Sequence, residues 1–431
     1  MKITVVGLGK IGLPLAVQFA MKGHEVFGAD VQPATVESVN AGRAPFPNEA
    51  HLEEYLSQVV ADGRLRADTD TAAAVSRSDA VVVVVPLFVD ADGVPDFRAM
   101  ESATRDIGRG LRPGTLVAYE TTLPVGTTRE RWKPLLESTS GLVEGEDFHA
   151  VFSPERVLTG RVFADLRKYP KLIGALSPAG AAAARDFYEA VLDFDERPDL
   201  ARGNGVWDLG SAEAAEMAKL AETTYRDVNI GLANQFGRFA ASRGIDIYQV
   251  IEASNSQPYS HIHRPGIAVG GHCIPVYPRL YLHTDPDASV VRAAREANVE
   301  MPAYTVGLAQ AALGSLAEAR ALVLGAAYRG GVKETALSGV FPTVAALQAA
   351  GAQAFVHDPL YSPEELRDLG LVPYEVGQSV DVAILQADHP EYADWGAADL
   401  PGVKVVVDGR RALDPARFEE VDFLVVGKGR A

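Results

Sequence analysis

The chain has 431 residues, which is too long for a single core and predicts two or three domains. Of these residues 47% are hydrophobic, 23% charged and 8% aromatic, a composition typical of globular proteins. The formal net charge of −17 argues against a nucleic-acid partner, because such partners require a basic surface. No stretch approaches the roughly 20 apolar residues that span a bilayer, and the chain opens directly on an apolar strand. We therefore expect a cytoplasmic protein that contacts neither nucleic acid nor membrane.

The chain begins with a strand at 2–7, a glycine-rich turn, a helix over 13–23 and a second strand at 25–30. The turn matches Gly-x-Gly-x-x-Gly, in which the glycines permit a tight turn, close approach of a pyrophosphate and close packing of helix on strand. Asp30 closes the second strand, where a carboxylate bonds ribose hydroxyls and repels a 2′-phosphate. These features predict an NAD site that includes Gly7, Gly9, Lys10, Ile11, Gly12 and Asp30.

Further apolar strands at 80–85, 115–119 and 149–152 alternate with helical segments, which predicts a mainly parallel sheet covered on both faces. Polar or turn residues follow these strands, at the carboxyl edge where open α/β sheets bind ligands. Pro86 and Thr121 are predicted to contact the cofactor, and Thr122 and Glu155 lie in equivalent places. Threonines there are also common turn residues, and a lone carboxylate is also common in solvated loops.

From about residue 208 to 255 the pattern predicts one long helix, because the segment contains no proline and few glycines. Glu216, Lys219, Thr223 and Arg226 share one face of this helix. They form either a solvated charged stripe or a functional face, on which the Lys219 ammonium would stabilise an oxyanion that develops during hydride and acyl transfer. More helix is predicted over 289–316.

Cys273 is the only cysteine and lies in the glycine-rich run 266–278. One cysteine excludes an intramolecular disulfide. The thiol is either a small buried hydrophobic group or a nucleophile that traps an aldehyde as a thiohemiacetal, which can lose a second hydride to become a thioester. His272 beside it would favour the thiolate. Because the spacing of His261, His263 and His272 matches no standard metal-ligand set, no metal site is predicted.

A second α/β pattern follows, with strands at 319–325, 353–358, 380–385, 403–408 and 422–426 and a helix over 339–351. The predicted fold class is α/β, with two Rossmann-like doubly wound domains joined by a long central helix. The predicted boundaries are an NAD-binding domain over 1–205, a central helical dimerisation segment over 206–316 and a C-terminal domain over 317–431.

Together these motifs resemble the UDP-glucose/GDP-mannose dehydrogenase family of NAD-dependent nucleotide-sugar 6-dehydrogenases, nearest the branch that oxidises UDP-N-acetylhexosamines. The likeness extends over essentially the whole chain. It is carried by the segments 6–14, 120–127, 152–156 (Phe-Ser-Pro-Glu-Arg), 218–229, 269–275 (Val-Gly-Gly-His-Cys-Ile-Pro) and 324–329.

The resemblance implies a homodimer formed largely by the central helix and a C-terminal domain that binds the nucleotide-diphosphate sugar. It also implies that Cys273 is the nucleophile, Lys219 the oxyanion-stabilising cation, Glu155 the general acid/base and Thr122 a positioner of water or substrate. The substrate contacts expected on this basis, with Arg329 and Lys333 as candidates for the phosphates, are Glu155, Lys219, Thr223, Arg264, Gly270, Tyr277, Arg329 and Lys333.

The sequence departs from the family pattern at four places. Tyr277 stands where an Asp usually holds the hydrolytic water, Thr223 where an Asn is usual, Ala336 where an Arg is usual, and Thr159 where a second carboxylate is usual. These changes bear on the hydrolysis step and on the identity of the sugar, and they leave the nucleophile, the lysine and the cofactor motif intact.

The predicted function is NAD-dependent, four-electron oxidation of the C6 hydroxyl of a UDP- or dTDP-linked glucose or N-acetylhexosamine to the uronic acid. The alternatives are a dehydrogenase that stops at the aldehyde and a catalytically silent nucleotide-binding relative. A hydroxyacid or phosphogluconate-type dehydrogenase would have no use for a second α/β domain or a covalent thiol.

Overall fold

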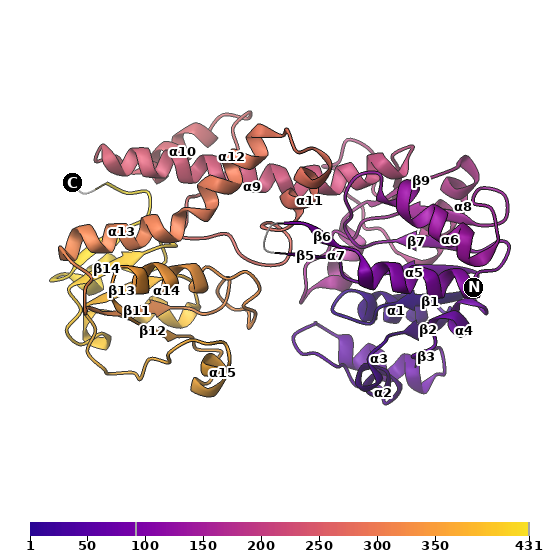
Figure 1. Ribbon diagram of the computed structural model, residues 1–431, viewed down its shortest axis with the longest axis horizontal. Helices are drawn as coiled ribbons and strands as arrows, with labels where there is room; N and C mark the ends of the chain where they lie inside the picture. Colours follow the sequence, from indigo (N-terminus) through magenta and orange to yellow (C-terminus); the bar gives the residue numbers. More distant parts are fainter. Residues whose placement is uncertain (91–92, 430–431) are drawn as a thin grey trace. The chain divides into compact units, whose positions relative to one another are not determined.

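The computed structural model describes residues 1–90 and 93–429 (Figure 1). Contacts divide the chain into two compact units, residues 1–222 and 223–431. The boundary falls within the longest helix, α9 (Ala212–Ser242). The two α/β units and the long helix confirm the predicted fold class.

The first unit is built on an eight-stranded sheet in the order β10-β9-β8-β7-β4-β1-β2-β3. Neighbouring strands run parallel except β8 and β9, which are antiparallel. A separate short hairpin pairs β5 (Phe88–Val89) with β6 (Pro95–Asp96). The strands of the sheet are β1 (Lys2–Val6), β2 (Glu25–Ala29), β3 (Leu65–Asp68), β4 (Ala80–Val83), β7 (Leu116–Tyr119), β8 (His149–Phe152), β9 (Lys171–Ala175) and β10 (Val206–Asp208).

Helices cover both faces of this sheet, as the apolar strands require. One core joins the sheet to α1 (Gly12–Met21), α3 (Leu52–Ala61), α7 (Val162–Lys168) and α8 (Pro178–Val191). On the other face α4 (Thr71–Val75), α5 (Arg98–Gly110) and α6 (Lys133–Ser140) pack in sequence. The remaining helical segments of the unit are α2 (Pro33–Asn40) and the π-helical turn η1 (Thr128–Trp132).

The second unit contains a parallel five-stranded sheet in the order β12-β11-β13-β14-β15. α13 and α14 pack on one face, and three short 3-10 helices lie with the core of the other face. Its strands are β11 (Arg320–Leu324), β12 (Gln353–His357), β13 (Val382–Leu385), β14 (Val405–Asp408) and β15 (Asp422–Val425). Its helices are α10 (Ile247–Asn255), α11 (Tyr277–Thr284), α12 (Ser289–Val299), α13 (Met301–Leu313), α14 (Val340–Ala349), α15 (Pro363–Asp368), η2 (Pro390–Asp394), η3 (Ala397–Asp399) and η4 (Pro415–Phe418).

The prediction of one continuous helix to residue 255 is wrong, because α9 ends at Ser242 and α10 begins at Ile247. Gly244 has φ +72°, a conformation that terminates a helix, and the Asp246 carboxylate caps α10 by accepting from the Tyr248 amide. Residues 427–429 complete this turn: the Ile247 amide donates to the Gly427 carbonyl and the Gly429 amide to the Ile245 carbonyl. The local sequence pattern does not indicate this contact with residues that are distant in the chain.

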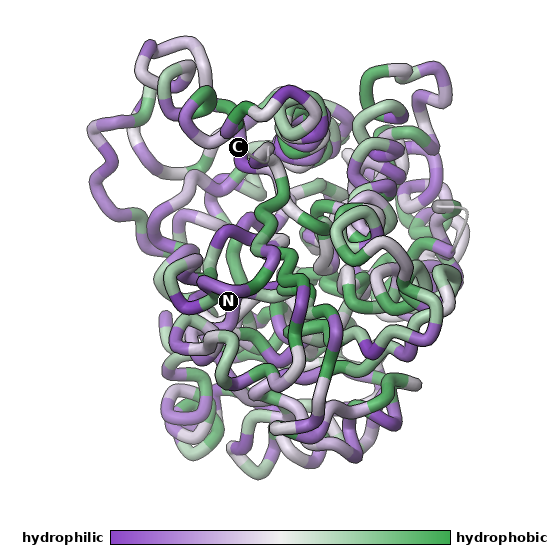
Figure 2. Tube along the Cα trace, turned by 90° about the vertical axis from the view of Figure 1, so that its left-hand side faces the viewer, coloured by the Kyte–Doolittle hydropathy of each residue, from purple (hydrophilic) through white to green (hydrophobic). Residues whose placement is uncertain are grey.

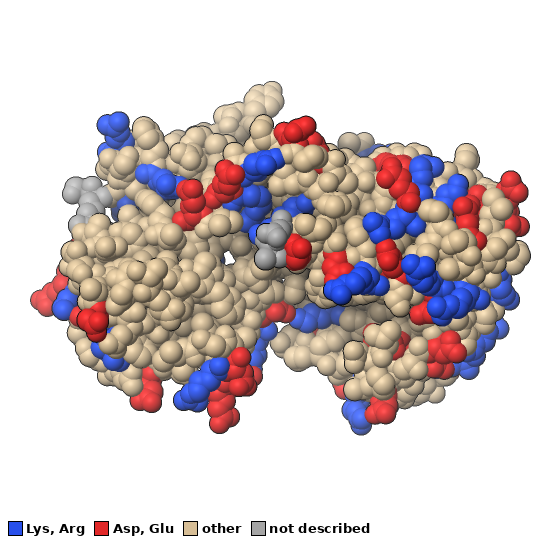
Figure 3. Space-filling model, viewed as in Figure 1, with Lys and Arg blue, Asp and Glu red and all other residues tan. Residues whose placement is uncertain are grey.

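In the described part of the chain no helix has the length and apolar character needed to cross a membrane. Hydrophobic and hydrophilic stretches are interspersed along the chain trace (Figure 2). On α5 Arg105 pairs with Glu101 and Arg109 with Asp106, and Arg131 of η1 pairs with the same Glu101. Blue and red side chains accordingly lie side by side over this unit in Figure 3.

Candidate active site

The first unit reverses its strand order between β1 and β4, which leaves the loops after these two strands side by side at the carboxyl edge of the sheet. The turn after β1 carries the glycine fingerprint, and the loop after β4 carries Pro86. A Cβ atom on Gly7, which has φ +91°, would lie 3.0 Å from the Val84 carbonyl oxygen. The two loops therefore meet only because residue 7 has no side chain.

The fingerprint glycines fit a dinucleotide. A Cβ atom on Gly12 would approach the Gly7 carbonyl oxygen to 1.8 Å, so the start of α1 packs directly on the turn. A Cβ atom on Gly9 would meet no atom within 4 Å, which leaves its backbone open to a pyrophosphate. Lys10 is exposed beside it, and Ile11 packs against the core.

Asp30 follows β2 and has two backbone partners. Its Oδ2 accepts from the Leu8 amide at 2.8 Å, and its Oδ1 accepts from the Gln32 amide at 2.9 Å. The side chain thus fixes the glycine turn while remaining partly exposed. This is the position from which a carboxylate reaches the ribose hydroxyls of a dinucleotide.

The loop at 120–128, which follows β7 and is called the threonine loop below, is held to α9 by one carboxylate. Glu216 is fully buried and accepts from the Gly126 amide at 2.6 Å and from the Thr128 amide and hydroxyl at 2.9 and 2.6 Å. Burial raises the pKa of Glu216 to about 7, although these hydrogen bonds oppose the shift. In the same loop Thr122 is buried, and the Thr121 hydroxyl donates to the Val85 carbonyl at 2.7 Å.

Glu155 lies just beyond β8, and its side chain is 10% exposed. Its Oε2 accepts from the Lys171 ammonium at 2.9 Å and its Oε1 from the Arg156 amide at 2.7 Å. Burial alone would raise the pKa of Glu155, but the charge and hydrogen bonds of Lys171, with the Arg156 amide and Glu120, hold it below its ordinary value. The Glu155 carboxylate is therefore ionised at neutral pH.

The functional face predicted on the long helix is buried rather than solvated. Lys219 is 7% exposed and Thr223 6%, whereas Arg226, one turn further on, is exposed. Lys219 follows Glu216 by three residues, so the helix that fastens the threonine loop also presents the lysine. The alternative of a fully solvated charged stripe does not hold for these positions.

The second unit repeats the arrangement of the first. Its strand order reverses between β11 and β13, and Gly325, with φ +101°, packs directly on Ala387 in the loop after β13. Asp358 closes β12 as Asp30 closes β2, and its Oδ2 accepts from the Ala326 and Ala327 amides. Asp358 is only 3% exposed, and His389 Nε2 lies 3.0 Å from the same oxygen. The Asp358 carboxylate therefore has a structural role.

Cys273 is exposed and lies in the turn that precedes α11, where the amide of Tyr277, the first residue of that helix, donates to the Cys273 carbonyl oxygen. The thiol is therefore not a buried hydrophobic group. Its Sγ is 3.7 Å from the Tyr277 hydroxyl, which occupies the position of the aspartate expected from the family pattern. His272 Nε2 lies 3.6 Å from Glu334 Oε2, which gives the imidazole a partner other than the thiol.

The cysteine loop is held on the second sheet by close backbone contacts. A Cβ atom on Gly270 would lie 2.7 Å from Cβ of Tyr328, and the Gly271 amide donates to the Ala336 carbonyl at 2.8 Å. The Gly-Gly pair before Cys273 is thus required for the loop to lie on Tyr328. Gly270 serves this packing, and its predicted substrate contact stays a prediction.

Three residues that hold this loop were not identified from the sequence. Arg410, after β14, donates to the Gln386 carbonyl at 2.7 Å and to the Ala268 carbonyl at 3.1 Å. On α9, Asn234 Oδ1 accepts from the Gly266 amide at 2.9 Å, and Asn229 Oδ1 accepts from the His263 amide at 3.0 Å. Asparagine is a poor helix former, so the presence of two asparagines within a predicted helix could have indicated that they have a role outside the helix.

The basic residues predicted to contact the substrate beyond Lys219, with Arg329 and Lys333 predicted for its phosphates, belong to the second unit. Arg264 and Arg329 are exposed, and the Arg329 Nε donates to the Tyr328 hydroxyl at 3.2 Å. Lys333 forms an ion pair with Glu365 on α15. The exposed pairing of Lys333 is weak, since ion pairs at the surface contribute about 1 kcal/mol or less.

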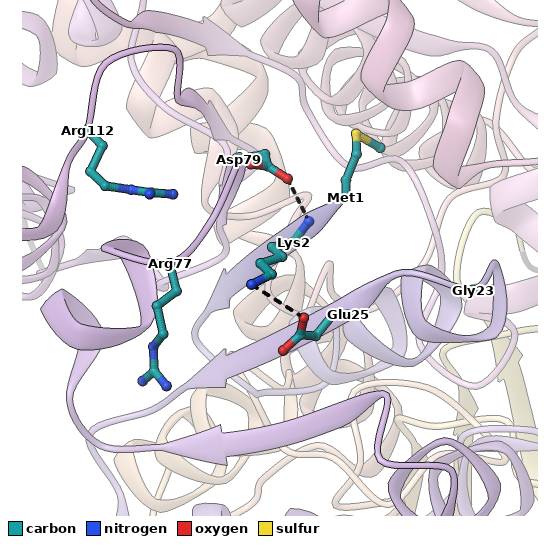
Figure 4. A pocket seen from close by; sticks show the side chains of 7 residues that line it. All are labelled: Met1, Lys2, Gly23, Glu25, Arg77, Asp79 and Arg112. Atoms are coloured by element: carbon teal, nitrogen blue, oxygen red, sulfur yellow. Dashed lines mark hydrogen bonds and ion pairs between the residues drawn. The ribbon is translucent and has the colours of Figure 1, made fainter.

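A surface hollow of about 600 Å³ lies at the opposite, amino edge of the first sheet (Figure 4). Its lining includes Lys2, whose ammonium is 3.8 Å from Glu25 and whose amide donates to Asp79. Because parallel sheets bind ligands at their carboxyl edge, this hollow is separate from the dinucleotide site. Within the described residues, no cluster of three His, Cys, Asp or Glu side chains could hold a metal ion.

A Rossmann unit with an open glycine turn, joined in one chain to a second doubly wound unit that carries an exposed thiol, defines an NAD-dependent dehydrogenase with a second nucleotide-binding unit. Comparison with known families gives the same answer. The NAD binding, central and UDP binding domains of the UDP-glucose/GDP-mannose dehydrogenase family match residues 1–192, 213–300 and 322–415. The chain belongs to this family and is an NAD-dependent oxidoreductase, as the motifs predicted.

The chain is 34% identical over its whole length to UDP-N-acetyl-D-mannosamine dehydrogenase of Pyrococcus horikoshii, of which the match covers 99%. It is 32% identical to an NDP-N-acetyl-D-galactosaminuronic acid dehydrogenase of Ralstonia nicotianae, over 95% of each chain. The solved structure of the P. horikoshii enzyme superposes over all of both chains with a TM-score of 0.87. These relatives agree with the predicted UDP-N-acetylhexosamine branch.

Proposed function

We propose that the protein oxidises the C6 hydroxyl of a UDP-linked N-acetylhexosamine to the uronic acid, with consumption of two NAD and one water. The observation that supports this most directly is the exposed Cys273 thiol, held by a glycine-rich loop on the second nucleotide-binding unit. The names of the P. horikoshii and R. nicotianae relatives favour an N-acetylhexosamine. A dTDP-linked sugar and UDP-glucose are the competing substrates.

The chain's own residues divide the work as follows. NAD, when bound, accepts the hydride removed from the substrate carbon in each oxidation. The Cys273 thiolate adds to the aldehyde formed first, and the resulting thiohemiacetal becomes a thioester when it loses the second hydride. Water then attacks the thioester, which releases the uronic acid and restores the thiolate.

Lys219 and Glu155 supply the charges that these reaction steps need. The Lys219 ammonium stabilises the oxyanion of the tetrahedral intermediates. Glu155, ionised through its contact with Lys171, takes a proton from the attacking water. Thr122 orients that water or the substrate oxygen, and the Tyr277 hydroxyl, 3.7 Å from the sulfur, hydrogen-bonds the thiolate.

The substrate and the stoichiometry can be measured together. The protein is mixed with NAD and a panel of UDP-, dTDP- and GDP-hexoses, including UDP-N-acetylmannosamine, and NADH is followed by absorbance. Two NADH per UDP-N-acetylhexosamine are expected. One NADH with an aldehyde product would establish the shorter reaction, and no NADH with any sugar would establish a silent relative.

Cys273→Ser tests the covalent route. We expect this variant to form no uronic acid, because a serine hydroxyl remains protonated at neutral pH and is a much weaker nucleophile than a thiolate. The product is analysed by mass spectrometry, with Tyr281→Phe on α11 as a control for disturbance of the loop. Uronic acid formation by Cys273→Ser at the wild-type rate would refute the covalent route.

We also propose that the protein forms a homodimer through α9. Four large apolar side chains recur along one side of this helix and are 39–59% exposed: Tyr225, Leu232, Phe236 and Phe239. An exposed apolar stripe of this length on a helix favours association, and a second copy of the chain presents the same stripe. The predicted three-part division and the cytoplasmic location stay predictions.

A further inference from the structure

A buried cluster of charges surrounds Glu155 in the first unit. The Lys171 ammonium donates to Glu155 Oε2 at 2.9 Å and to Glu120 Oε2 at 2.8 Å, and the Tyr188 hydroxyl donates to Glu120 Oε1 at 2.7 Å. The antiparallel pairing of β8 and β9 explains the arrangement. Because β9 runs backwards, its first residue, Lys171, lies at the edge where β7 and β8 end.

The cluster is too deeply buried for all its groups to be charged. Glu120 is 2% exposed and Lys171 5%, and two carboxylates facing one ammonium would leave a net negative charge in the interior. An uncompensated buried charge is costly, so the cluster retains a proton. Burial raises the pKa of Glu120 to about 7, against the opposing effect of Lys171, while the pKa of Glu155 is lowered.

The neighbouring groups fix which carboxyl holds the proton. The Glu155 carboxylate receives a second hydrogen bond from the Arg156 amide, whereas the Arg156 guanidinium turns away to Glu222 at 2.9 Å. Burial and the charge of Glu120 raise the pKa of Tyr188 well above its ordinary value, so its hydroxyl remains a donor. Below neutral pH the proton therefore resides on Glu120.

We propose that Glu120 and Lys171 are positioning residues for Glu155. Glu120 and Glu155, which both contact the Lys171 ammonium, hold one proton between them, and loss of that proton from Glu120 makes Glu155 a stronger base. The negative charge that appears on Glu120 raises the proton affinity of Glu155 beside it. This inference rests on the proposed function for the role of Glu155 in catalysis. The shared proton itself is independent of that role.

The shared proton is tested on the full-length protein without substrate. Infrared difference spectra between pH 6 and pH 8 should show the loss of a buried carboxylic-acid carbonyl band. Because Glu216 also has a pKa raised to about 7, the comparison is made in the Glu216→Gln background. Glu216→Gln should retain a band from Glu120, and the double variant Glu120→Gln/Glu216→Gln should lack it. Persistence of the band in the double variant would overturn the inference.

The positioning role is tested by the pH dependence of kcat/KM. In Glu120→Gln the ratio of kcat/KM at pH 8 to that at pH 6 should fall roughly threefold, the change expected for a base weakened by one pKa unit. Tyr188→Phe removes a donor to Glu120 and should move the same transition to higher pH, which keeps the test available if Glu120→Gln fails to fold. Lys171→Arg, which preserves the charge, should retain the transition.

The two tests separate the possible failures. Loss of the band with an unchanged pH profile would show that the proton is shared but overturn the positioning role. A changed profile together with two NADH per substrate supports both the inference and the proposed function. Product stoichiometry is measured independently of the infrared band, so an error in the assigned substrate does not affect the test of the shared proton.

Discussion

At the scale of single residues, Asp30 has a structural contact and a predicted cofactor contact that a substitution can separate. Its carboxylate holds the glycine turn through the Leu8 amide, and its charge is predicted to face the ribose of the bound dinucleotide. Asp30→Asn keeps a carbonyl oxygen and removes the charge. We expect the preference for NAD over NADP, measured as the ratio of kcat/KM, to fall roughly tenfold because repulsion of a 2′-phosphate is lost.

Asp79→Asn is the matched control for this change, because Asp79 also accepts a backbone amide, that of Lys2, but at the amino edge of the sheet. It should leave the cofactor preference unaltered. An equal loss of preference in both variants would mean that Asp30 acts through the stability of the unit.

Glu216 gives the protein a stability that depends on pH. The pKa rises from 4.5 to about 7 on folding, so the folded protein binds this proton more tightly than the unfolded chain. Stability from this group is therefore lost as the pH rises from about 4.5 to 7. At about 1.4 kcal/mol per pKa unit the loss is about 3 kcal/mol.

Glu216→Gln should remove this pH dependence while keeping an acceptor for the threonine loop. Urea unfolding at pH 5 and pH 7 measures the effect as the difference between the two midpoints. That difference should be smaller in Glu216→Gln than in the wild type. An identical difference would show that Glu216 is ionised throughout this range.

Some site residues could be predicted from the sequence and others could not, because only some of them lie in local motifs. The fingerprint glycines, Asp30 and Cys273 lie in local motifs whose spacing carries the geometry. Lys171 and Arg410 act through contacts with residues far away in the chain, and no local pattern marks them. Their roles follow only from the way the strands are ordered.

At the scale of elements, the turn between α9 and α10 depends on two glycines. Gly244 has φ +72°, and a Cβ atom on Gly429 would lie 2.4 Å from the Gly244 Cα. Gly244→Ala should lower the stability of the second unit by about 1 kcal/mol or more, because a side chain disfavours this backbone conformation. Thermal unfolding measures the loss.

Gly307 within α13 is the contrasting position, since a Cβ atom there would meet nothing within 4 Å. Gly307→Ala should raise stability by about 0.5–1 kcal/mol through helix propensity. Equal effects of the two substitutions would contradict the assigned role of Gly244.

The elements themselves were predictable where they are long and strongly apolar, as β1, β4 and β11 are. β3, β9 and β10 were missed. β3 has only four residues with alternating burial, and β10 only three. The reversal of β9 against its neighbour is decided by tertiary packing, and that reversal brings Lys171 to the site.

At the scale of the whole molecule, the proposed dimer makes the α9 stripe a target. Phe239→Glu places a charge on an apolar side chain that is 58% exposed. We expect the mass in solution, measured by light scattering, to fall from that of a dimer to that of a monomer, because a charge buried at an interface is costly.

Val290→Glu on α12 is the control, since Val290 is also apolar and is 66% exposed but lies outside the stripe. It should leave the mass unchanged. A monomeric wild type, or a dimeric Phe239→Glu variant, would contradict association through this face.

The two-domain α/β architecture was predictable because its apolar strands recur in two series separated by a helical stretch. The equivalence of particular turns in the two units was not predictable. Asp30 and Asp358 hold equivalent turns, yet their neighbouring sequences differ, and only the strand order reveals the correspondence.

The turn completed by residues 427–429 also bears on the order in which the chain folds during synthesis. The Tyr248 hydroxyl donates to the Val426 carbonyl, 178 positions later in the sequence. The beginning of α10 therefore waits for a segment that is synthesised much later than α10 itself, when every strand of the first sheet has already been made. The first unit should reach its native form before the second.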